Sequence, residues 1–235
     1  MRDRLPLLVG LTVLALAIGL GSVAIANGIR DRNRNDVITV TGSAKKRIRS
    51  DYVIWDLSVT SQQPTGPAAL KELAGWTQTI SSFLRHQGVA ARELSVQPIS
   101  TETVRSRRRI TSFRLTRSFE VRSSRVDVIS VVAEHSGSLV ARGMPVVADP
   151  PEYIFTKLPS LRPELLTSAT GDAQRRGRAL LASTPGHLGR LENVDVGVFQ
   201  VTSPNSTDVS DYGEYDTSTI EKDVTAVVDV TFALN

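Results

Sequence analysis

The sequence predicts an α+β fold with a largely antiparallel sheet and about three helices, preceded by one N-terminal transmembrane helix. Three observations favour this fold class. An uncharged apolar stretch fills residues 5–26 of the 235-residue chain. From residue 37 onward, segments recur in which apolar and polar side chains alternate, as they do in half-buried strands. Helical patterns are interspersed among pairs of such segments, which favours antiparallel pairing over strict β-α-β alternation.

Residues 5–26 predict a membrane anchor. A helix of about 22 residues spans roughly 33 Å, which is enough to cross a hydrocarbon core of about 30 Å. Residues 1–4 form a short basic N-terminus before this stretch, and the polar residues 27–36 read as a tether between the membrane and a domain at 37–235. The sequence therefore predicts a single-pass protein that contacts the membrane through residues 5–26.

The triplet Ala24-Ile25-Ala26 has the form of a signal-peptide cleavage site, so a cleaved, exported protein stays open as an alternative. More positive residues follow the apolar stretch than precede it, and that count alone would keep the domain in the cytoplasm. Long domains, however, translocate largely regardless of charge. We therefore expect the domain on the extracytoplasmic, periplasmic side of the cell membrane.

Composition excludes several classes of protein. The chain has no cysteine, so disulfides, thiolate catalysis and cysteine-based metal sites are ruled out. Its formal charge is +4, with arginines crowded in the middle and acidic residues near the end. A chain with this uneven charge is dipolar rather than uniformly basic, which argues against a nucleic-acid binder.

The first half of the domain predicts strands at 37–41 and 52–60, the second with alternating apolar residues. Between them lies a basic run, defined as Lys45, Lys46, Arg47 and Arg49, which we interpret as the solvated link of a β-hairpin. A helix is predicted over 67–88, with Pro67 near its start and Gly88 at its stop.

The next predicted strands, 92–100 and 112–122, are joined through an arginine-rich stretch that contains Arg105, Arg107, Arg108 and Arg109. We interpret this stretch too as a solvated hairpin turn. Contact of these arginines and of the basic run with anionic lipid headgroups, or with the acidic residues 208–223 of a neighbouring subunit, stays open.

A capping box at Ser124–Asp127 predicts a helix that runs toward Gly143. The remaining predicted elements are a short strand at 151–158, a helix at 162–183, strands at 194–202 and 223–235, and a polar loop at 203–219. The residues that we expect in the core are Trp55, Leu73, Ile80, Phe113, Phe119, Leu165, Val228 and Phe232.

Signals for catalysis are weak. Residues 171–178, GDAQRRGR, lack the Lys-Ser/Thr ending of a phosphate loop and fall within a predicted helix. The histidines His86, His135 and His187 have no metal-ligand spacing, and no Gly-x-Ser-x-Gly elbow is present. We therefore predict no enzyme, no catalytic residues, no metal and no cofactor.

Several motifs, taken together, resemble those of one known family. They are Gly42 followed by Asp51, the QGV…ELSVQP turn from 87 to 98, Tyr-x-Phe-Thr-Lys-Leu at 153–158, and Gly186-x-x-Gly189. The region 37–235 is similar to the SIMPL domain, a bacterial envelope family long described as a domain of unknown function. The resemblance implies an extracytoplasmic α+β protein, ring-like oligomers in some members and links to envelope or oxidative stress. It also implies that Gly42 takes a turn and that Asp51 begins the second strand.

We therefore expect a membrane-anchored, non-enzymatic interaction or scaffold module of the cell envelope, able to form homo-oligomers. The alternative is a soluble exported protein released after Ala26 that binds a ligand or protects against stress.

Overall fold

The computed structural model describes residues 36–106, 109–206 and 212–235. It confirms an α+β fold with antiparallel sheets and three helices of two turns or more. The predicted anchor at 5–26, the basic residues 1–4 and tether residues 27–35 lie outside the described residues. Within the described ranges, none of the helices is both long and apolar enough to cross a membrane.

The described chain forms two compact units. The first contains residues 36–42, Thr170–Val196 and Val228–Asn235. The second contains Ser43–Ala169 and Gly197–Val227. Three long elements contribute residues to both units, namely strands β1 (Val37–Arg49) and β10 (Glu221–Leu234) and helix α5 (Leu158–Leu181).

A six-stranded sheet lies in the second unit. Its central pair is β2 (Tyr52–Gln63) with β5 (Arg109–Ser123), antiparallel from Val53↔Ser123 to Gln63↔Phe113. The strand order is β3-β5-β2-β6, with β4 paired to β5 and β7 paired to β2. The shorter strands are β3 (Leu94–Val96), β4 (Ser100–Ser106), β6 (Val146–Ala148) and β7 (Glu152–Ile154). The predicted strands 52–60 and 112–122 are confirmed by β2 and β5. The strand predicted over 92–100 pairs with β5 as expected but is interrupted at 97–99, and the strand that leads to the arginine-rich stretch is β4, which was not predicted.

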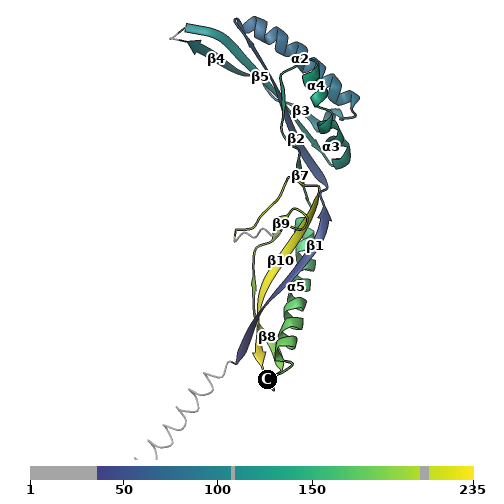
Figure 1. The fold of residues 1–235 in the computed structure, drawn as a ribbon, viewed down its shortest axis with the longest axis vertical. Coiled ribbons are helices and arrows are strands. Elements are labelled where there is room, and N and C mark those ends of the chain that lie inside the picture. The colour runs from purple at the N-terminus through teal and green to yellow at the C-terminus, as the bar shows by residue number, and fades with distance from the viewer. Residues whose placement is uncertain (1–35, 107–108, 207–211) are drawn as a thin grey trace, which may run out of the picture. The chain divides into compact units, whose positions relative to one another are not determined.

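Helices α2 (Gly66–His86), α3 (Val126–Glu134) and α4 (Gly137–Ala141) lie on one face of this sheet (Figure 1). Thr65 caps α2 by accepting a hydrogen bond from the backbone N–H of Ala68, and Gly88, at φ +94°, follows the end of the helix. The predicted helix 67–88 is confirmed because proline at the start and glycine after the end fit these positions.

The single helix predicted from Ser124 toward Gly143 is wrong. The chain instead forms α3 and α4, which are separated at His135 and Ser136. The capping box is also absent, because the N-cap residue of α3 is Arg125 and its side chain makes no capping hydrogen bond.

A four-stranded sheet has the order β1-β10-β8, with β9 paired to β10. Its shorter strands are β8 (Leu188–Val196) and β9 (Gln200–Thr202). The single strand predicted over 194–202 is wrong, because Gly197 interrupts it; a Cβ there would lie 3.1 Å from the carbonyl oxygen of Val227. The predicted strand 223–235 is confirmed by β10.

Helix α5 begins four residues before the predicted helix 162–183, with Pro163 in its second turn. The strand predicted over 151–158 is confined to β7.

In the first unit, Gly177 of α5 faces Leu188, and a Cβ on Gly177 would lie 3.0 Å from Leu188 Cδ1. Gly177 therefore permits a close approach of helix and strand inside that unit.

Two apolar cores form in the second unit. The larger joins the six-stranded sheet to α2, α3 and α4, with Trp55, Leu73, Ile80 and Phe119 fully or almost fully buried. The smaller joins Ile48 of β1, Leu165 of α5 and Val224 of β10, together with neighbouring apolar residues. Of the eight predicted core residues, all are buried except Phe113, which is partly buried against the larger core.

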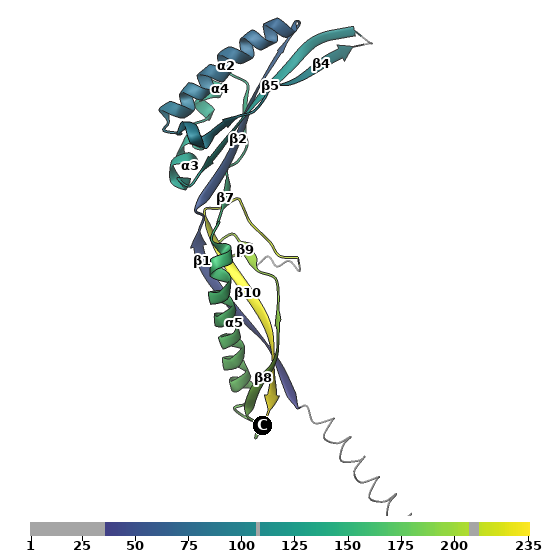
Figure 2. The same cartoon turned by 180° about the vertical axis from the view of Figure 1, so that it is seen from behind.

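The hairpin predicted across the basic run is wrong. Strand β1 continues without a break through Gly42 to Arg49, and β1 and β2 belong to different sheets (Figure 2). Gly42 is buried within the strand rather than placed at a turn. Asp51 does precede the second strand, which begins at Tyr52.

Candidate interaction site

The basic run lies on strand β1, where alternate side chains point to opposite faces of the sheet. Ile48 points into the smaller core of the second unit. Lys45, Arg47 and Arg49 share the opposite face, where charged groups can meet the polar residues at the start of β10. The direction of each charged side chain thus follows from its position on β1, which extends further than the sequence pattern predicted.

Asp223 is the central partner of the basic run. Its carboxylate accepts hydrogen bonds from Arg47 Nε at 2.9 Å and Arg47 Nη2 at 3.1 Å, and from the backbone N–H of Asn205 at 3.1 Å. Lys45 Nζ lies 3.6 Å from the same group. The Asp223 side chain is only 3% exposed. The Arg47 hydrogen bonds chiefly lower the pKa of Asp223, to about 2, although burial opposes them.

The other two residues of the basic run are also paired. Arg49 donates to Glu221 at 2.9 Å and forms a second ion pair with Asp127 of α3. Lys46 Nζ donates to Glu164 of α5 at 2.6 Å. Each basic residue of the run therefore has an acidic partner inside the second unit, and these contacts hold β1, β10, α3 and α5 in that unit.

Lys222 is a buried cation that the sequence did not single out. Its side chain is 0% exposed, and Nζ donates to the carbonyl of Thr219 at 2.6 Å and to Asp216 Oδ2 at 3.2 Å. Asp216 also accepts from the hydroxyls of Ser218 and Thr219. Burial lowers the pKa of Lys222, and Asp216 opposes that shift. These bonds fold the segment before β10 onto the strand.

Strands β4 and β5 form a hairpin, seen as a two-stranded ribbon in Figure 2, in which Arg105 pairs with Ile110 and Arg109 pairs with Ser106. Arg105 and Arg109 are exposed, and neither forms an ion pair with another described residue. Next to Arg109, Ile110 is 50% exposed. Further along the ribbon, Arg114 pairs with Glu102 at 3.0 Å. The other two candidate residues, Arg107 and Arg108, lie outside the described residues.

Two of the sequence motifs meet in the second unit. The carboxylate of Asp51 accepts a hydrogen bond from the backbone N–H of Thr156 at 2.7 Å and from its hydroxyl at 2.9 Å. Lys157 Nζ lies 3.7 Å from the same carboxylate. The Gly42…Asp51 motif and the Tyr-x-Phe-Thr-Lys-Leu motif therefore share a structural contact, since Asp51 fixes the turn between β7 and α5.

Glu93 and Arg125 form a further ion pair, which joins the turn before β3 to the start of α3. Ser123 donates to Glu93 Oε1 at 2.7 Å, and the backbone N–H of Ala90 donates to Oε2 at 2.9 Å. The Arg125 hydrogen bond lowers the pKa of Glu93 to about 2, aided by Ser123 and Ala90 and opposed by burial. The QGV…ELSVQP motif contains this buried acid.

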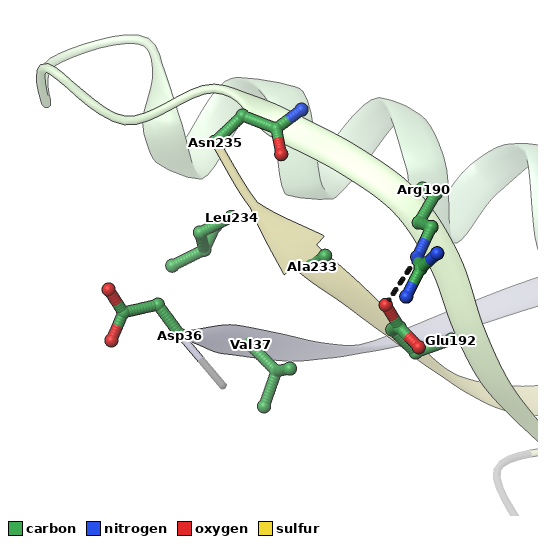
Figure 3. A pocket seen from close by; sticks show the side chains of 7 residues that line it. All are labelled: Asp36, Val37, Arg190, Glu192, Ala233, Leu234 and Asn235. Atoms are coloured by element: carbon green, nitrogen blue, oxygen red, sulfur yellow. Dashed lines mark hydrogen bonds and ion pairs between the residues drawn. The ribbon is translucent and has the colours of Figure 1, made fainter. Parts of the chain in front are cut away.

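A pocket of about 600 Å³ lies in the first unit, and Figure 3 shows the side chains that line it. On one side, Arg190 Nε donates to Glu192 Oε1 at 2.7 Å, and this bond raises the pKa of Arg190. The remaining lining residues are Asp36, Val37, Ala233, Leu234 and Asn235. Arg190 and Glu192 thus neutralise each other, and Asp36 is the other charged side chain of the lining.

The histidines occupy separate places. His86 lies at the end of α2, with Nδ1 2.7 Å from the carbonyl oxygen of Ser82, and His135 is the C-cap residue of α3. His187 pairs through its backbone with Asn235. Within the ranges that the structure covers, no three potential metal ligands come together.

Comparison with known proteins gives one family. A family model described as "SIMPL: Protein of unknown function (DUF541)" matches residues 38–232. No curated protein matches the sequence.

Among solved structures, the chain is similar to a hydantoinase/carbamoylase family amidase from Burkholderia ambifaria, at 15% identity and a TM-score of 0.25, over 54% of this chain and 35% of that one. A second amidase of that family, from Burkholderia multivorans, gives 10% identity and a TM-score of 0.24, over 53% and 31%. A putative amidohydrolase/peptidase from Burkholderia cenocepacia has 10% identity and a TM-score of 0.23, over 61% of this chain and 37% of that one. The chain thus spans about a third of the length of these structures, and likeness at this level carries no conclusion about activity.

Proposed function

The chain belongs to the SIMPL family of proteins of unknown function, and from this premise we propose that it is a membrane-anchored interaction module of the cell envelope. Residues 5–26 hold it in the cell membrane, and the SIMPL domain lies on the extracytoplasmic, periplasmic side. The module is non-enzymatic, assembles with further copies of itself and serves in envelope stress.

The membrane anchor is supported by the uncharged stretch at 5–26, which is long enough to span a bilayer. It is longer than the apolar region of an ordinary signal peptide. The tether that follows it contains no apolar periodicity, so the anchor is separated from the domain by a short polar link.

A non-enzymatic role is supported by the pairing of three acidic side chains. Asp223 is held by Arg47, Glu93 by Arg125 and Glu192 by Arg190. In each case the charges neutralise each other within the fold. Catalytic groups instead face a substrate position together.

The arginine hairpin is the surface that we propose for contact with anionic lipid headgroups. Arg105 and Arg109 form no ion pair with any residue of the described ranges and lie beside the half-exposed Ile110, and arginine next to an apolar side chain suits a lipid interface. The acidic segment of a neighbouring copy is a poorer partner. Three of its four described carboxylates, those of Asp216, Glu221 and Asp223, are already paired within their own chain, which leaves only Glu214.

Self-association is supported by the edges of the four-stranded sheet. Among the described strands, β1 and β8 each pair with β10 alone, so each presents one free edge. An edge strand can pair with a strand of another chain. On β8, Leu191 and Val196 are 48% and 54% exposed, which adds apolar surface to such a contact.

Mass spectrometry of the mature chain, after separation of membrane and soluble fractions, tests the proposal. We expect a chain with an intact N-terminus in the membrane fraction. A chain that begins at Asn27 in the soluble fraction would instead support the alternative, a released exported protein that binds a ligand or protects against stress.

A further inference from the structure

A second pocket, of about 300 Å³, lies in the second unit beside Trp55. Its wall is held rigidly by the backbone of Asp149, which follows β6. The indole Nε1–H of Trp55 donates to the Asp149 carbonyl at 3.0 Å, and the Asp149 N–H donates to the carbonyl of Asp56 at 3.0 Å. Pro150 and Pro151 come next and restrict the backbone further. The pocket is therefore preformed.

The hydroxyl groups that line this pocket are already hydrogen-bonded. Ser130 Oγ donates to the carbonyl of Val126 at 2.8 Å and lies 3.0 Å from the hydroxyl of Tyr153. Because Ser130 has one proton, the Tyr153 hydroxyl supplies the proton between the two oxygens. Ser136 Oγ donates to the carbonyl of Ala133 at 2.6 Å. These groups hold the wall together and offer little to a ligand.

Two carboxylates remain. Glu134 is the last residue of α3, and Asp149 is the first residue after β6. Both residues line the pocket and are exposed. Neither side-chain carboxylate forms a hydrogen bond or ion pair with another residue in the part of the chain that the structure describes. The free hydrogen-bonding capacity of the pocket thus consists of anionic acceptors.

The surrounding potential has the same sign. Glu134 lies at the C-terminal end of a helix, where the helix dipole disfavours an acidic side chain and favours a cation. On the neighbouring strand, burial and then the charges of Glu120, Asp149 and Glu152 raise the pKa of Asp56. A cation bound beside Glu134 and Asp149 would oppose this negative potential, although it would not change the burial of Asp56.

We propose that this pocket binds a small organic cation with a primary ammonium group. The ammonium donates to the carboxylates of Glu134 and Asp149, and its alkyl part lies against Tyr153 and the two prolines, next to the buried Trp55. Ammonium groups supply three donors and a positive charge, which match two carboxylates, and aromatic walls favour cations further. This site is independent of the anchor and of the arginine hairpin.

Tryptophan fluorescence tests the site in the full chain in detergent. The chain has two tryptophans, so Trp76→Phe leaves Trp55 as the single indole reporter. Titration with n-butylammonium chloride, at ionic strength fixed with sodium chloride, is expected to give a saturable change in Trp55 emission. n-Butanol, the neutral probe of similar size, is expected to give none.

Glu134→Gln and Asp149→Asn, each in the Trp76→Phe background, should weaken binding by about tenfold or more, since each removes a charged acceptor. Glu192→Gln, which removes a carboxylate in the first unit, should leave binding unchanged. Both pocket substitutions replace exposed side chains, and circular dichroism checks that the variants fold. Absence of a saturable response, an equal response to n-butanol, or binding that survives both pocket substitutions would overturn the proposal.

Discussion

Arg47 and Asp223 lie 176 positions apart in the sequence and form a two-pronged ion pair between β1 and β10, with N–O distances of 2.9 and 3.1 Å. The Asp223 side chain is almost fully buried, whereas that of Arg47 is half-exposed. A basic run that resembles a binding motif in the sequence is therefore part of the internal framework of the second unit. On the β4–β5 hairpin, by contrast, the exposed Arg105 and Arg109 form no ion pair with another described residue.

Asp223→Asn is expected to lower the free energy of unfolding by about 2 kcal/mol, because a buried carboxylate loses its charge while its donors stay in place. Urea denaturation of the full chain in detergent measures the change. Glu164→Gln is the matched control, since the Glu164–Lys46 pair has side chains that are 60% and 44% exposed. Exposed pairs contribute about 1 kcal/mol or less. Equal losses in the two variants would show that burial of Asp223 does not matter.

Glu93 makes stability depend on pH. Its folded-state pKa of about 2 lies below that of an unfolded glutamate, so its contribution is present above the unfolded pKa and is lost as pH falls through the folded value. We expect the native chain to exceed Glu93→Gln in stability by up to about 3 kcal/mol at pH 6. The difference should shrink between pH 5 and pH 2. A difference that is constant over this range would contradict the ionised Glu93–Arg125 pair.

Lys222→Met should destabilise the chain by about 3 kcal/mol, because it leaves Asp216 partly buried without its cation. Adding Asp216→Asn removes the charge that was left behind, so the double variant should lose less than the sum of the two single losses. Thermal unfolding of the four chains forms the double-mutant cycle. Strictly additive losses would mean that Lys222 and Asp216 do not act as a pair.

Local patterns predicted the elements whose signals are contained within a few residues. The helix over 67–88 has proline and glycine at its ends, and the strand over 52–60 alternates without interruption. Both agree with the structure. The helix expected from Ser124 was wrong because a Ser-x-x-Asp pattern alone does not ensure a capping hydrogen bond, and Arg125 takes the N-cap position.

The path of β1 could not be predicted from nearby residues. Its apolar positions after Gly42 are Ala44 and Ile48, and consecutive basic residues obscure their alternation. The reason that strand structure is stable there lies far along the chain, in Asp223, Glu221 and Glu164. One sequence shows both charge groups but not their pairing. The carboxylates at the Trp55 pocket were missed for the same reason, because Glu134 and Asp149 come together only through the fold.

The arginine hairpin predicts a salt-sensitive contact with anionic lipid. The native chain has no cysteine, so Ser106→Cys, next to Arg105, accepts a single polarity-sensitive dye. With the full chain in neutral-lipid nanodiscs, vesicles that contain phosphatidylglycerol should shift the dye emission to the blue, and high salt should reverse the shift.

Arg105→Glu together with Arg109→Glu should abolish that shift without loss of stability, because both residues are exposed. Lys71→Glu, a charge reversal at an exposed position of α2, is the matched control and should retain it. An equal shift with neutral phosphatidylcholine vesicles would rule out recognition of headgroup charge.

The same single-cysteine chain tests the central claim, that residues 5–26 anchor a domain on the extracytoplasmic side of the membrane. Cells that express the full Ser106→Cys chain are treated with a membrane-impermeant maleimide before lysis, and the membrane fraction is then analysed for label. The account predicts a labelled chain of full mass in that fraction. A chain that is labelled only after the cytoplasmic membrane is opened would contradict it.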